Sequence, residues 1–254
     1  MAGARVADIL AALAAAGPSA SWPDHLVETC RRSTGVTGVG LALVDRTGVS
    51  GIVAATPGVG RELEDLQFSL GEGPCTEASL SGRPVLCSDL ADDGGARWPA
   101  FAREAERAGV SAAFTFPLQV GAVALGVLDL YRSETGPLHG THLSEAVAHA
   151  DAAVAVLLHL QGRDDETGGT GLADLADRRA VVHQAAGMVS VQLGVEVTDA
   201  LRALRAHAWA HDRSIGDVAG DVVARRLRFH DSGSGTAGDT EVRDPGPGPG
   251  GEPA

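Results

Sequence analysis

The chain has 254 residues, a length that suits one large domain or two modest ones. Hydrophobic residues make up 44% of it, enough for a packed core, and 33 acidic against 20 basic residues leave a net charge of −13. That charge excludes a broadly basic nucleic-acid binder, because Lys and Arg carry phosphate binding. Three cysteines without a CxxC spacing exclude a disulfide scaffold and a zinc finger.

Residues 1–20 combine an arginine with an Ala/Leu stretch, as secretory signal peptides do. Asp8 interrupts that stretch, however, and its large apolar residues recur at helical spacing. These residues are Val6, Ile9, Leu10 and Leu13. We therefore expect an amphipathic helix over residues 3–16. Because no apolar run approaches the roughly 20 residues of a membrane span, we expect a cytoplasmic protein without a membrane partner.

Residues 1–160 are predicted to form an α+β domain in which helices flank an antiparallel sheet. Helical patterns cover residues 3–16, 23–32, 75–81, 99–108 and 142–160, and residues 62–69 form a helix or a loop. Apolar runs typical of strands cover residues 39–44, 51–55, 84–87, 112–120 and 123–131. Turns at residues 45–48 and 121–122 join successive strands into hairpins.

The helix predicted over residues 142–160 carries an apolar stripe, which we expect to pair with a second copy in a parallel dimer. The stripe consists of Leu143, Val147, Ala150, Val154, Leu157 and Leu158. The polar, Gly-rich residues 161–171 are predicted to be a linker or a helix junction. The Gly/Pro/Ser/Asp-rich residues 231–254 are expected to form a disordered acidic tail.

Residues 172–230 are predicted to form a three-helix domain. Its first helix covers residues 172–193, and its second covers residues 199–210 with Thr198 as the N-cap. Ser214 begins an approximate capping box for the third helix. This domain holds 8 arginines against 7 acidic residues and so stands at +1, whereas residues 1–171 hold 11 against 21 and stand at −10.

The sequence shows no constellation that points to catalysis or metal binding. The histidines in and beside the helix at 142–160 have no Cys or carboxylate at ligand spacing, so we expect surface or interface residues. They are His139, His142, His149 and His159. Cys75 begins a short helix, where the helix dipole lowers the pKa of a thiol. Three interpretations of Cys75 stay open: a catalytic residue, a ligand-pocket or redox-sensing residue, and a structural residue. The glycines of residues 35–40 lack a phosphate-loop pattern. We expect no enzyme, no metal and no cofactor.

Arginines concentrate in the three-helix domain, where His183 and Gln184 add hydrogen-bonding side chains. Two interpretations stay open, a nucleic-acid-binding face and an ordinary solvated helix face, because the same segment carries seven acidic residues. The arginines are Arg178, Arg179, Arg202, Arg205, Arg213, Arg225, Arg226 and Arg228.

Three stretches of this domain carry a specific resemblance. Residues 179–189 read RAVVHQAAGMV, residues 198–208 read TDALRALRAHA, and residues 215–219 read IGDVA. In this order they resemble the ANTAR domain, which implies a three-helix module that binds paired RNA stem-loops and prevents transcription termination. We therefore expect RNA contacts at Arg179, Gln184, Arg202 and Arg205, with Gly187 and Met188 as shape elements. At Ala186 the family usually carries Lys or Arg, so one cation of the expected RNA face is missing.

The first domain carries a second resemblance. Residues 68–75 read FSLGEGPC, residues 83–85 read RPV, residues 97–99 read RWP, and residues 126–131 read GVLDLY. They are similar to the GAF domain, a small-molecule sensor fold, and the whole chain resembles the GAF–ANTAR regulators of actinobacteria. The GAF resemblance implies a ligand pocket between the sheet and the loops over it. We expect its lining at Phe68, Cys75, Phe116 and Leu130, unless these side chains simply fill the core.

The sequence thus predicts a signalling regulator that couples a GAF-like sensor of a small-molecule or protein signal to RNA binding. A homodimer through residues 142–160 and the ANTAR-like domain would present two modules to two stem-loops and raise affinity through multivalency. The alternative is a sensor with a dimerisation or protein-interaction module that does not bind RNA. The near-neutral charge of residues 172–230 and Ala186 favour this alternative.

Overall fold

The computed structural model of the protein describes residues 2–45, 48–167, 180–211 and 213–230. The chain divides into two compact units, Met1–Ala180 and Val181–Ala254. The expected tail at 231–254 and residues 168–171 of the expected linker lie outside the described residues, as do Arg178 and Arg179. Residues 161–167 of that linker are instead the last turns of the helix Gly140–Thr167.

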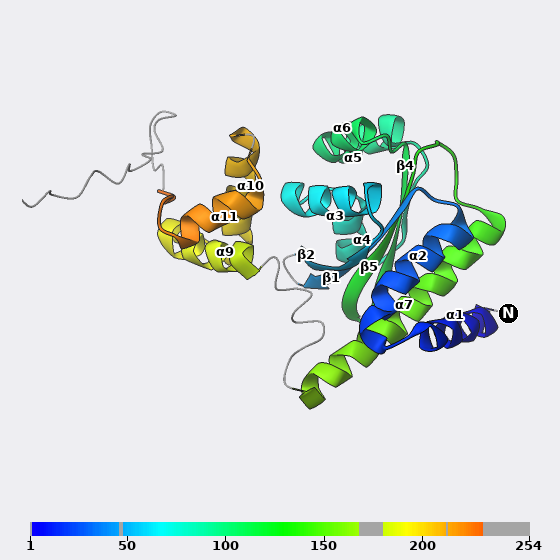
Figure 1. The fold of residues 1–254 in the computed structure, drawn as a ribbon. Coiled ribbons are helices and arrows are strands. Elements are labelled where there is room, and N and C mark those ends of the chain that lie inside the picture. The colour runs from blue at the N-terminus through cyan, green and yellow to red at the C-terminus, as the bar shows by residue number, and fades with distance from the viewer. Residues whose placement is uncertain (1, 46–47, 168–179, 212, 231–254) are drawn as a thin grey trace, which may run out of the picture. The chain divides into compact units, whose positions relative to one another are not determined.

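The first unit is built on an antiparallel sheet (Figure 1). Its five strands are β1 (Gly38–Asp45), β2 (Gly48–Ala55), β3 (Val85–Cys87), β4 (Ala112–Val120) and β5 (Val123–Arg132). They lie in the order β2-β1-β5-β4-β3, and every neighbouring pair is antiparallel. Each of the predicted strands is present, and its bounds agree with the prediction to within a few residues.

Helices cover both faces of this sheet (Figure 1). On one face lie α1 (Ala2–Ala16), a short turn η1 (Ser19–Ser21), α2 (Trp22–Thr34) and α7 (Gly140–Thr167). On the other face lie α3 (Val59–Leu70) and α4 (Pro74–Ser81), and the chain continues through η2 (Leu90–Gly94), α5 (Gly95–Arg97) and α6 (Pro99–Arg107). The predicted α+β fold is confirmed, and residues 62–69 belong to a helix.

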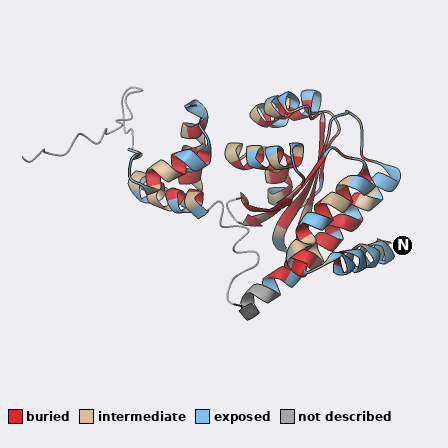
Figure 2. Ribbon diagram, in the orientation of Figure 1, coloured by how far each residue is buried: buried red, intermediate tan, exposed pale blue. Residues whose placement is uncertain are grey.

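The main hydrophobic core lies between the sheet and the layer of α2 and α7. Successive strand residues point to opposite faces, and alternate apolar residues of β4 and β5 point into this core. They include Phe114, Phe116 and Leu118 of β4 and Leu128 and Leu130 of β5. Figure 2 shows the strands almost wholly buried and each of these helices buried along one side. Leu13 of α1 is buried against the same core, so the expected amphipathic helix over residues 3–16 is confirmed.

Helix α7 uses part of its predicted dimer stripe inside the domain. Ala150 and Leu157 are buried in the core, because α7 packs with this side against the sheet. Val147 and Leu158 remain 41% and 44% exposed, and Val154 is partly buried. The predicted stripe is therefore two surfaces, one facing the core and one facing outward.

The same helix comes closest to the dimensions of a membrane span. Residues 140–162 are long and apolar enough to cross a membrane by length and composition alone, which we did not expect from the sequence. Half of their most apolar stretch is buried inside the protein, as in the core helix of a packed domain.

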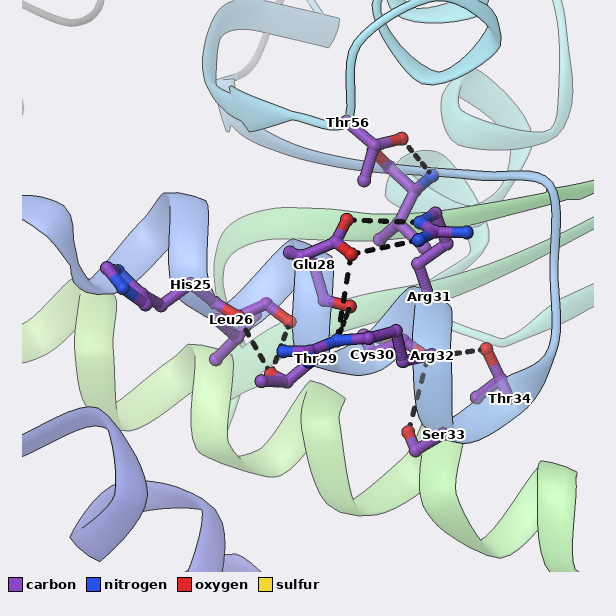
Figure 3. Close-up of polar contacts among 11 residues, drawn as sticks. His25, Leu26, Glu28, Thr29, Cys30, Arg31, Arg32, Ser33, Thr34 and Thr56 are labelled. Atoms are coloured by element: carbon purple, nitrogen blue, oxygen red, sulfur yellow. Dashed lines mark hydrogen bonds and ion pairs between the residues drawn. The ribbon is translucent and has the colours of Figure 1, made fainter. Parts of the chain in front are cut away.

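The polar side of α2 is occupied by local contacts (Figure 3). The carboxylate of Glu28 accepts two hydrogen bonds from the guanidinium of Arg31, at 3.0 and 2.9 Å. These bonds lower the pKa of Glu28. The hydroxyl of Thr29 donates to the carbonyl oxygen of His25 one turn earlier, at 2.8 Å. Contacts of this kind stabilise the helix itself.

The described part of the second unit contains α9 (Ala180–Leu193), α10 (Val197–Ala210) and α11 (Ile215–Val223). Each helix buries one apolar face, as the periodicity predicts. The buried residues include Val182, Ala185 and Val189 of α9, Leu201 and Leu204 of α10, and Val218 and Val222 of α11.

The two predicted helix caps have different outcomes. The hydroxyl of Ser214 accepts a hydrogen bond from the N–H of Asp217 at 3.0 Å, so the cap of α11 is confirmed. The cap predicted at Thr198 is wrong, because α10 begins at Val197 and its N-cap is Glu196. The N–H of Ala200 already donates to the carbonyl oxygen of Glu196 at 3.0 Å, so the first turn starts before Thr198.

Replacing the confirmed cap tests this assignment. Ser214→Ala leaves an N–H of the first turn of α11 without its acceptor and should lower the stability of that helix by about 1 kcal/mol. Hydrogen exchange of the α11 amides in the full chain measures the change. Ser144→Ala, which removes an exposed hydroxyl inside α7, should leave the exchange of α11 unchanged. Equal exchange in both variants would contradict the assignment.

Candidate functional site

A network of buried polar side chains lies where α3 packs on the sheet. Glu64 and Gln67 of α3 and Asp129 and Tyr131 of β5 are each at most 1% exposed. The hydroxyl of Tyr131 donates to Oε1 of Glu64 at 2.8 Å and accepts from Nε2 of Gln67 at 2.7 Å. The hydroxyl of Thr115 on β4 donates to Oδ1 of Asp129. These bonds join α3 to the two central strands.

Two glycines of β1 make room for α3. Gly40 pairs with Asp129 in the sheet, and a Cβ at Gly40 would lie 2.1 Å from Oε1 of Glu64. A Cβ at Gly38 would lie 2.7 Å from the backbone nitrogen of Gly60, at the start of α3. Real side chains do not approach so closely. Gly38 and Gly40 thus permit close helix–strand packing, and Gly40 gives Glu64 its place in the network.

The network buries more than one carboxyl group. Burial raises the pKa of Asp129 well above its ordinary value, and the charge of Glu64 raises it further. Burial and the same two carboxylates also raise the pKa of Tyr131. Oδ2 of Asp129 has no hydrogen-bond partner among the described residues. Asp129 is therefore held protonated to a higher pH than an exposed aspartate.

The loop at residues 71–75 is tied to this network at one side and to α6 at the other. The N–H of Cys75 donates to Oε1 of Gln67 at 2.8 Å. Oε1 of Glu72 accepts the N–H groups of Ala100 and Phe101, at 2.7 and 2.8 Å. These N–H groups belong to the first turn of α6 and have no acceptor within their own helix. The GEGPC stretch therefore holds α6 against the α3–α4 layer.

The thiol of Cys75 is 1% exposed, and burial raises its pKa well above the ordinary value. The charges of Asp129 and Glu64 raise it further. Because the thiolate is the reactive form, this environment argues against the catalytic and redox-sensing interpretations and favours the structural one. Cys30 and Cys87 are also free and buried, and burial raises the pKa of both.

The structure does not bring the four expected pocket residues together. Phe68 and Cys75 are buried on α3 and α4. Phe116 and Leu130 belong to the core against α2 and α7, on the opposite face of the sheet. Because strand residues alternate between faces, the side chains that share the face of α3 are Thr115 and Asp129, each one residue earlier.

Three of the four histidines in and beside α7 are exposed, as the sequence indicates: His139, His142 and His159. His149 is the exception, since it is 2% exposed and lies on the buried side of α7. Its Nδ1 lies 2.8 Å from the carbonyl oxygen of Glu145, and burial lowers its pKa. His159 stacks on Trp22 with ring centroids 5.0 Å apart. Within the described ranges no group of three or more His, Cys, Asp or Glu is placed to hold a metal ion.

In the second unit, an open groove of about 550 Å³ lies between α9 and the chain that follows α11. Three of the expected RNA-contact residues line it, and they recur along one side of α9, away from the buried Val182, Ala185 and Val189. The lining residues are Gln184, Gly187, Met188, Val191 and Gln192 of α9, with Arg225 and Arg228. We call this the α9 groove.

The arginines of the second unit differ in whether an acidic side chain already pairs with them. Arg202 pairs with Asp199. Arg213 and Arg226 both pair with Asp221, at 2.6 and 2.7 Å. Arg225 and Arg228 form no ion pair with any described residue. The α9 groove is therefore lined by two cations that are not neutralised by neighbours.

The remaining expected RNA contacts do not line this groove. Arg202 and Arg205 lie three residues apart on α10, and Trp209, 52% exposed, follows on the same side of the helix. Arg179 lies outside the described residues. Ala186 is 0% exposed and shares the buried face of α9, so the cation missing there is not missing from the groove.

The shape of the α9 groove depends on the tight turn at Arg225 that ends α11. The N–H of Arg226 donates to the carbonyl oxygen of Asp221 at 2.8 Å, and the N–H of Arg225 donates to that of Val222 at 3.0 Å. This pair of bonds defines a Schellman motif, whose left-handed position glycine usually occupies. Here Arg225 occupies it with φ 61°, and it is the only non-glycine residue with positive φ in the described chain.

Beyond this stop, the chain folds back over α9. Leu227 is 7% exposed. The N–H of Phe229 donates to Oε1 of Gln192 at 2.8 Å, and its ring meets the ring of His207 edge-on at 5.3 Å. Arg228 is thereby placed between two anchored residues.

Sequence reasoning missed the buried network and half of the α9 groove. The signal for the network is present, since Asp129 is the one charged residue in the apolar run at 123–131. Because successive strand residues point to opposite faces of a sheet, Asp129 must point away from the face that Leu128 and Leu130 share. Arg225 and Arg228 stand out only as members of an arginine-rich segment, and nothing in the sequence marks a left-handed turn there.

Family comparisons match both units. The model of the GAF domain family matches residues 24–158, and the model of the ANTAR domain family matches residues 171–223. The chain belongs to the GAF domain family, and its ANTAR domain follows in the order of a GAF–ANTAR regulator.

Solved structures share the fold of the first unit. The GAF domain of a phosphoenolpyruvate-protein phosphotransferase from Coxiella burnetii is 15% identical, covers 65% of this chain and 96% of its own, and has a TM-score of 0.50. The GAF domain of the cyanobacteriochrome TePixJ is 18% identical, with 57% and 92% coverage and a TM-score of 0.45. At such identities the likeness concerns the fold alone. No curated protein matches the chain.

The buried carboxyl of Asp129 predicts an unusual pH dependence. Its pKa is raised in the folded chain above the roughly 3.9 of an unfolded aspartate. The folded state then binds more protons than the unfolded state above about pH 4, so the free energy of unfolding falls as pH rises. The slope from this group is at most about 1.4 kcal/mol per pH unit. Asp129→Asn, which keeps the shape, should remove that slope and stabilise the chain at pH 7.

Chemical denaturation between pH 4.5 and pH 8 measures both chains. The matched control is Asp92→Asn, which changes an exposed aspartate of η2 and should leave the slope as it is. A slope that Asp129→Asn does not reduce would refute the buried, protonated state of this carboxyl.

Proposed function

We propose that this protein is a cytoplasmic signalling regulator, in which the GAF domain controls RNA binding by the ANTAR domain and thereby transcription termination at paired stem-loops. The observation that carries the proposal is the α9 groove beside the ANTAR match, because the expected contact residues Gln184, Gly187 and Met188 line it together. Arginine binds backbone phosphate, and amides hydrogen-bond the edges of unpaired bases. The ANTAR match supports RNA as the ligand.

The proposed RNA contacts fall into two sets. Gln184, Gly187 and Met188 act in the α9 groove, where the absence of a side chain at Gly187 lets RNA approach the helix. Arg202 and Arg205 act from α10, where the exposed ring of Trp209 offers a surface for base stacking. Arg179, just before α9, completes the proposed set.

The proposed signal site lies on the α3–α4 side of the GAF domain. Phe68 and Cys75 belong to that layer, and Oδ2 of Asp129 is buried there without a hydrogen-bond partner among the described residues. A small molecule that accepts a hydrogen bond from this protonated carboxyl would remove a cost of burial. Both domain families are regulatory, and the buried thiol of Cys75 supports a protein that is not an enzyme.

The proposed homodimer forms through the outward surface of α7. Val147, Val154 and Leu158 are separated by seven and four residues, the spacing of a coiled-coil seam. Asp151 lies within the same stripe, four residues after Val147 and three before Val154, so the proposed seam carries one acidic side chain. This set replaces the wider stripe that includes the buried Ala150 and Leu157.

One observation favours the alternative, a protein-interaction module that does not bind RNA. Val191, Val195 and Val197 are 83%, 37% and 42% exposed around the junction of α9 and α10. Apolar side chains gathered in this way are typical of protein contacts. Direct RNA binding separates the two functions.

The first test of the proposed function uses a labelled pool of RNAs that carry two stem-loops with randomised loops. We expect binding by fluorescence anisotropy at low salt and an affinity that falls as salt rises. A matched pool with one stem-loop replaced by an unstructured segment should bind about tenfold more weakly, because a dimer engages both loops. RNAs selected from the pool and placed before a terminator should give read-through. A folded dimer that binds neither pool at low salt would exclude the RNA function.

The second test concerns the dimer. Val147→Glu combined with Leu158→Glu places charges on the outward surface of α7 and should weaken self-association at least about tenfold, because like charges then face each other across the seam. Analytical ultracentrifugation measures the effect, and circular dichroism verifies the fold. The control Leu80→Glu changes an apolar residue of α4 that is 77% exposed. Equal association of the two variants would place the dimer contact elsewhere.

A further inference from the structure

The segment at residues 224–230, here called the C-terminal arm, lies beyond the ANTAR match, which ends at residue 223. It is nevertheless held in place. Leu227 is 7% exposed, and the backbone N–H of Phe229 is bonded to the side chain of Gln192 on α9. The arm therefore forms one wall of the α9 groove as a fixed part of the second unit.

The three arginines of the arm differ in whether an acidic side chain pairs with them. Arg226 is occupied by Asp221, at 2.7 Å. Arg225 and Arg228, on either side in the sequence, make no such pair within the described chain and both line the groove. The arm thus presents two free cations to the groove and turns its other arginine away from it.

The lining of the α9 groove carries positive charge that no acidic lining residue among the described residues offsets. No acidic residue is among its described lining residues, which are otherwise amide or apolar. A second groove, in the GAF domain between α3 and α6, shows the contrast: it is lined by Glu62, Asp65 and Glu104, with Arg107 as its cation. Of these two grooves, the α9 groove has the charge that a polyanion requires.

The backbone of Arg225 adds an independent observation. At φ 61° it takes the left-handed conformation in which glycine is the favoured residue and a side chain is strained. A residue kept in such a conformation points to a role for its side chain. Stability alone would favour glycine at the end of α11.

From these observations we infer that the C-terminal arm is part of the RNA-binding surface, with Arg225 and Arg228 binding backbone phosphates across the α9 groove from Gln184 and Gln192. The inference rests on the proposed function and extends it beyond the residues that the ANTAR family covers. Phosphate is the group that suits unpaired guanidinium groups, and the neighbouring amides suit the bases.

The experiment uses the full chain and the labelled pool of two-stem-loop RNAs. The variants are Arg225→Gly, Arg228→Gln and their combination, and the matched control is Arg226→Gln, which removes the same charge from the same arm outside the groove. At 0.1 M salt each groove variant should bind about fivefold more weakly, and the combination about 25-fold. The slope of log affinity against log salt should shrink by about 0.7–0.9 for each arginine. The control should stay within about twofold of the unchanged chain.

A second readout separates binding from structure. Arg225→Gly relieves the left-handed strain and should raise the melting temperature of the second unit by about 2–5 °C while it lowers RNA affinity. If Arg225 had only a structural role, the RNA affinity of Arg225→Gly would rise together with its melting temperature.

The outcomes are distinct. If the unchanged chain binds the RNA pool and the combined variant binds it equally well, the inference fails and the proposed function stands. If the unchanged chain binds no RNA at low salt, both fail. If the combined variant keeps its RNA affinity but loses self-association, the groove is a contact between protein chains, and the inference is overturned.

Discussion

The burial of the carboxyl groups of Glu64 and Asp129 is the constraint on which the GAF domain depends. A carboxyl group removed from water must find hydrogen-bond partners or give up its charge. Here the partners are the hydroxyls of Tyr131 and Thr115. Gly40 admits this arrangement, since any side chain there would displace Glu64. The position of α3 follows from it, and through Gln67 and Glu72 so do the positions of the loop at 71–75 and of α6.

In the ANTAR domain, pairing decides the effective charge of each surface. The total of −13 describes the chain as a whole, but a ligand meets only local charges within about a Debye length. The single carboxylate of Asp221 pairs with both Arg213 and Arg226. These two hydrogen-bonded guanidinium groups lower the pKa of this carboxyl, so it stays ionised as the pH falls. Arg225 and Arg228 remain outside that cluster. Acidic surfaces elsewhere would repel RNA that lacks a specific fit.

Much of the fold could be predicted from the sequence, because long apolar runs and helical periodicity are strong local signals. The runs at 112–120 and 123–131 became β4 and β5. The face to which each residue points was harder, since a strand buried on both sides shows no alternation. For that reason Phe116 and Leu130 were expected in the pocket, whereas Thr115 and Asp129 lie on the side of α3. At Arg225 the sequence carries no signal for the left-handed backbone conformation, because a residue other than glycine adopts it only where the surrounding structure imposes it.

Helix α7 has a mechanical consequence. Its 28 residues span about 42 Å at 1.5 Å per residue. Its buried side is anchored on the sheet through Ala150 and Leu157, while the helix continues to Thr167, past the end of the GAF match. A rod anchored near its middle magnifies small rotations: a tilt of about 5° moves an end about 20 Å away by about 2 Å. A change in packing too small to alter the core would therefore displace the end of the helix by about half the distance between consecutive Cα atoms.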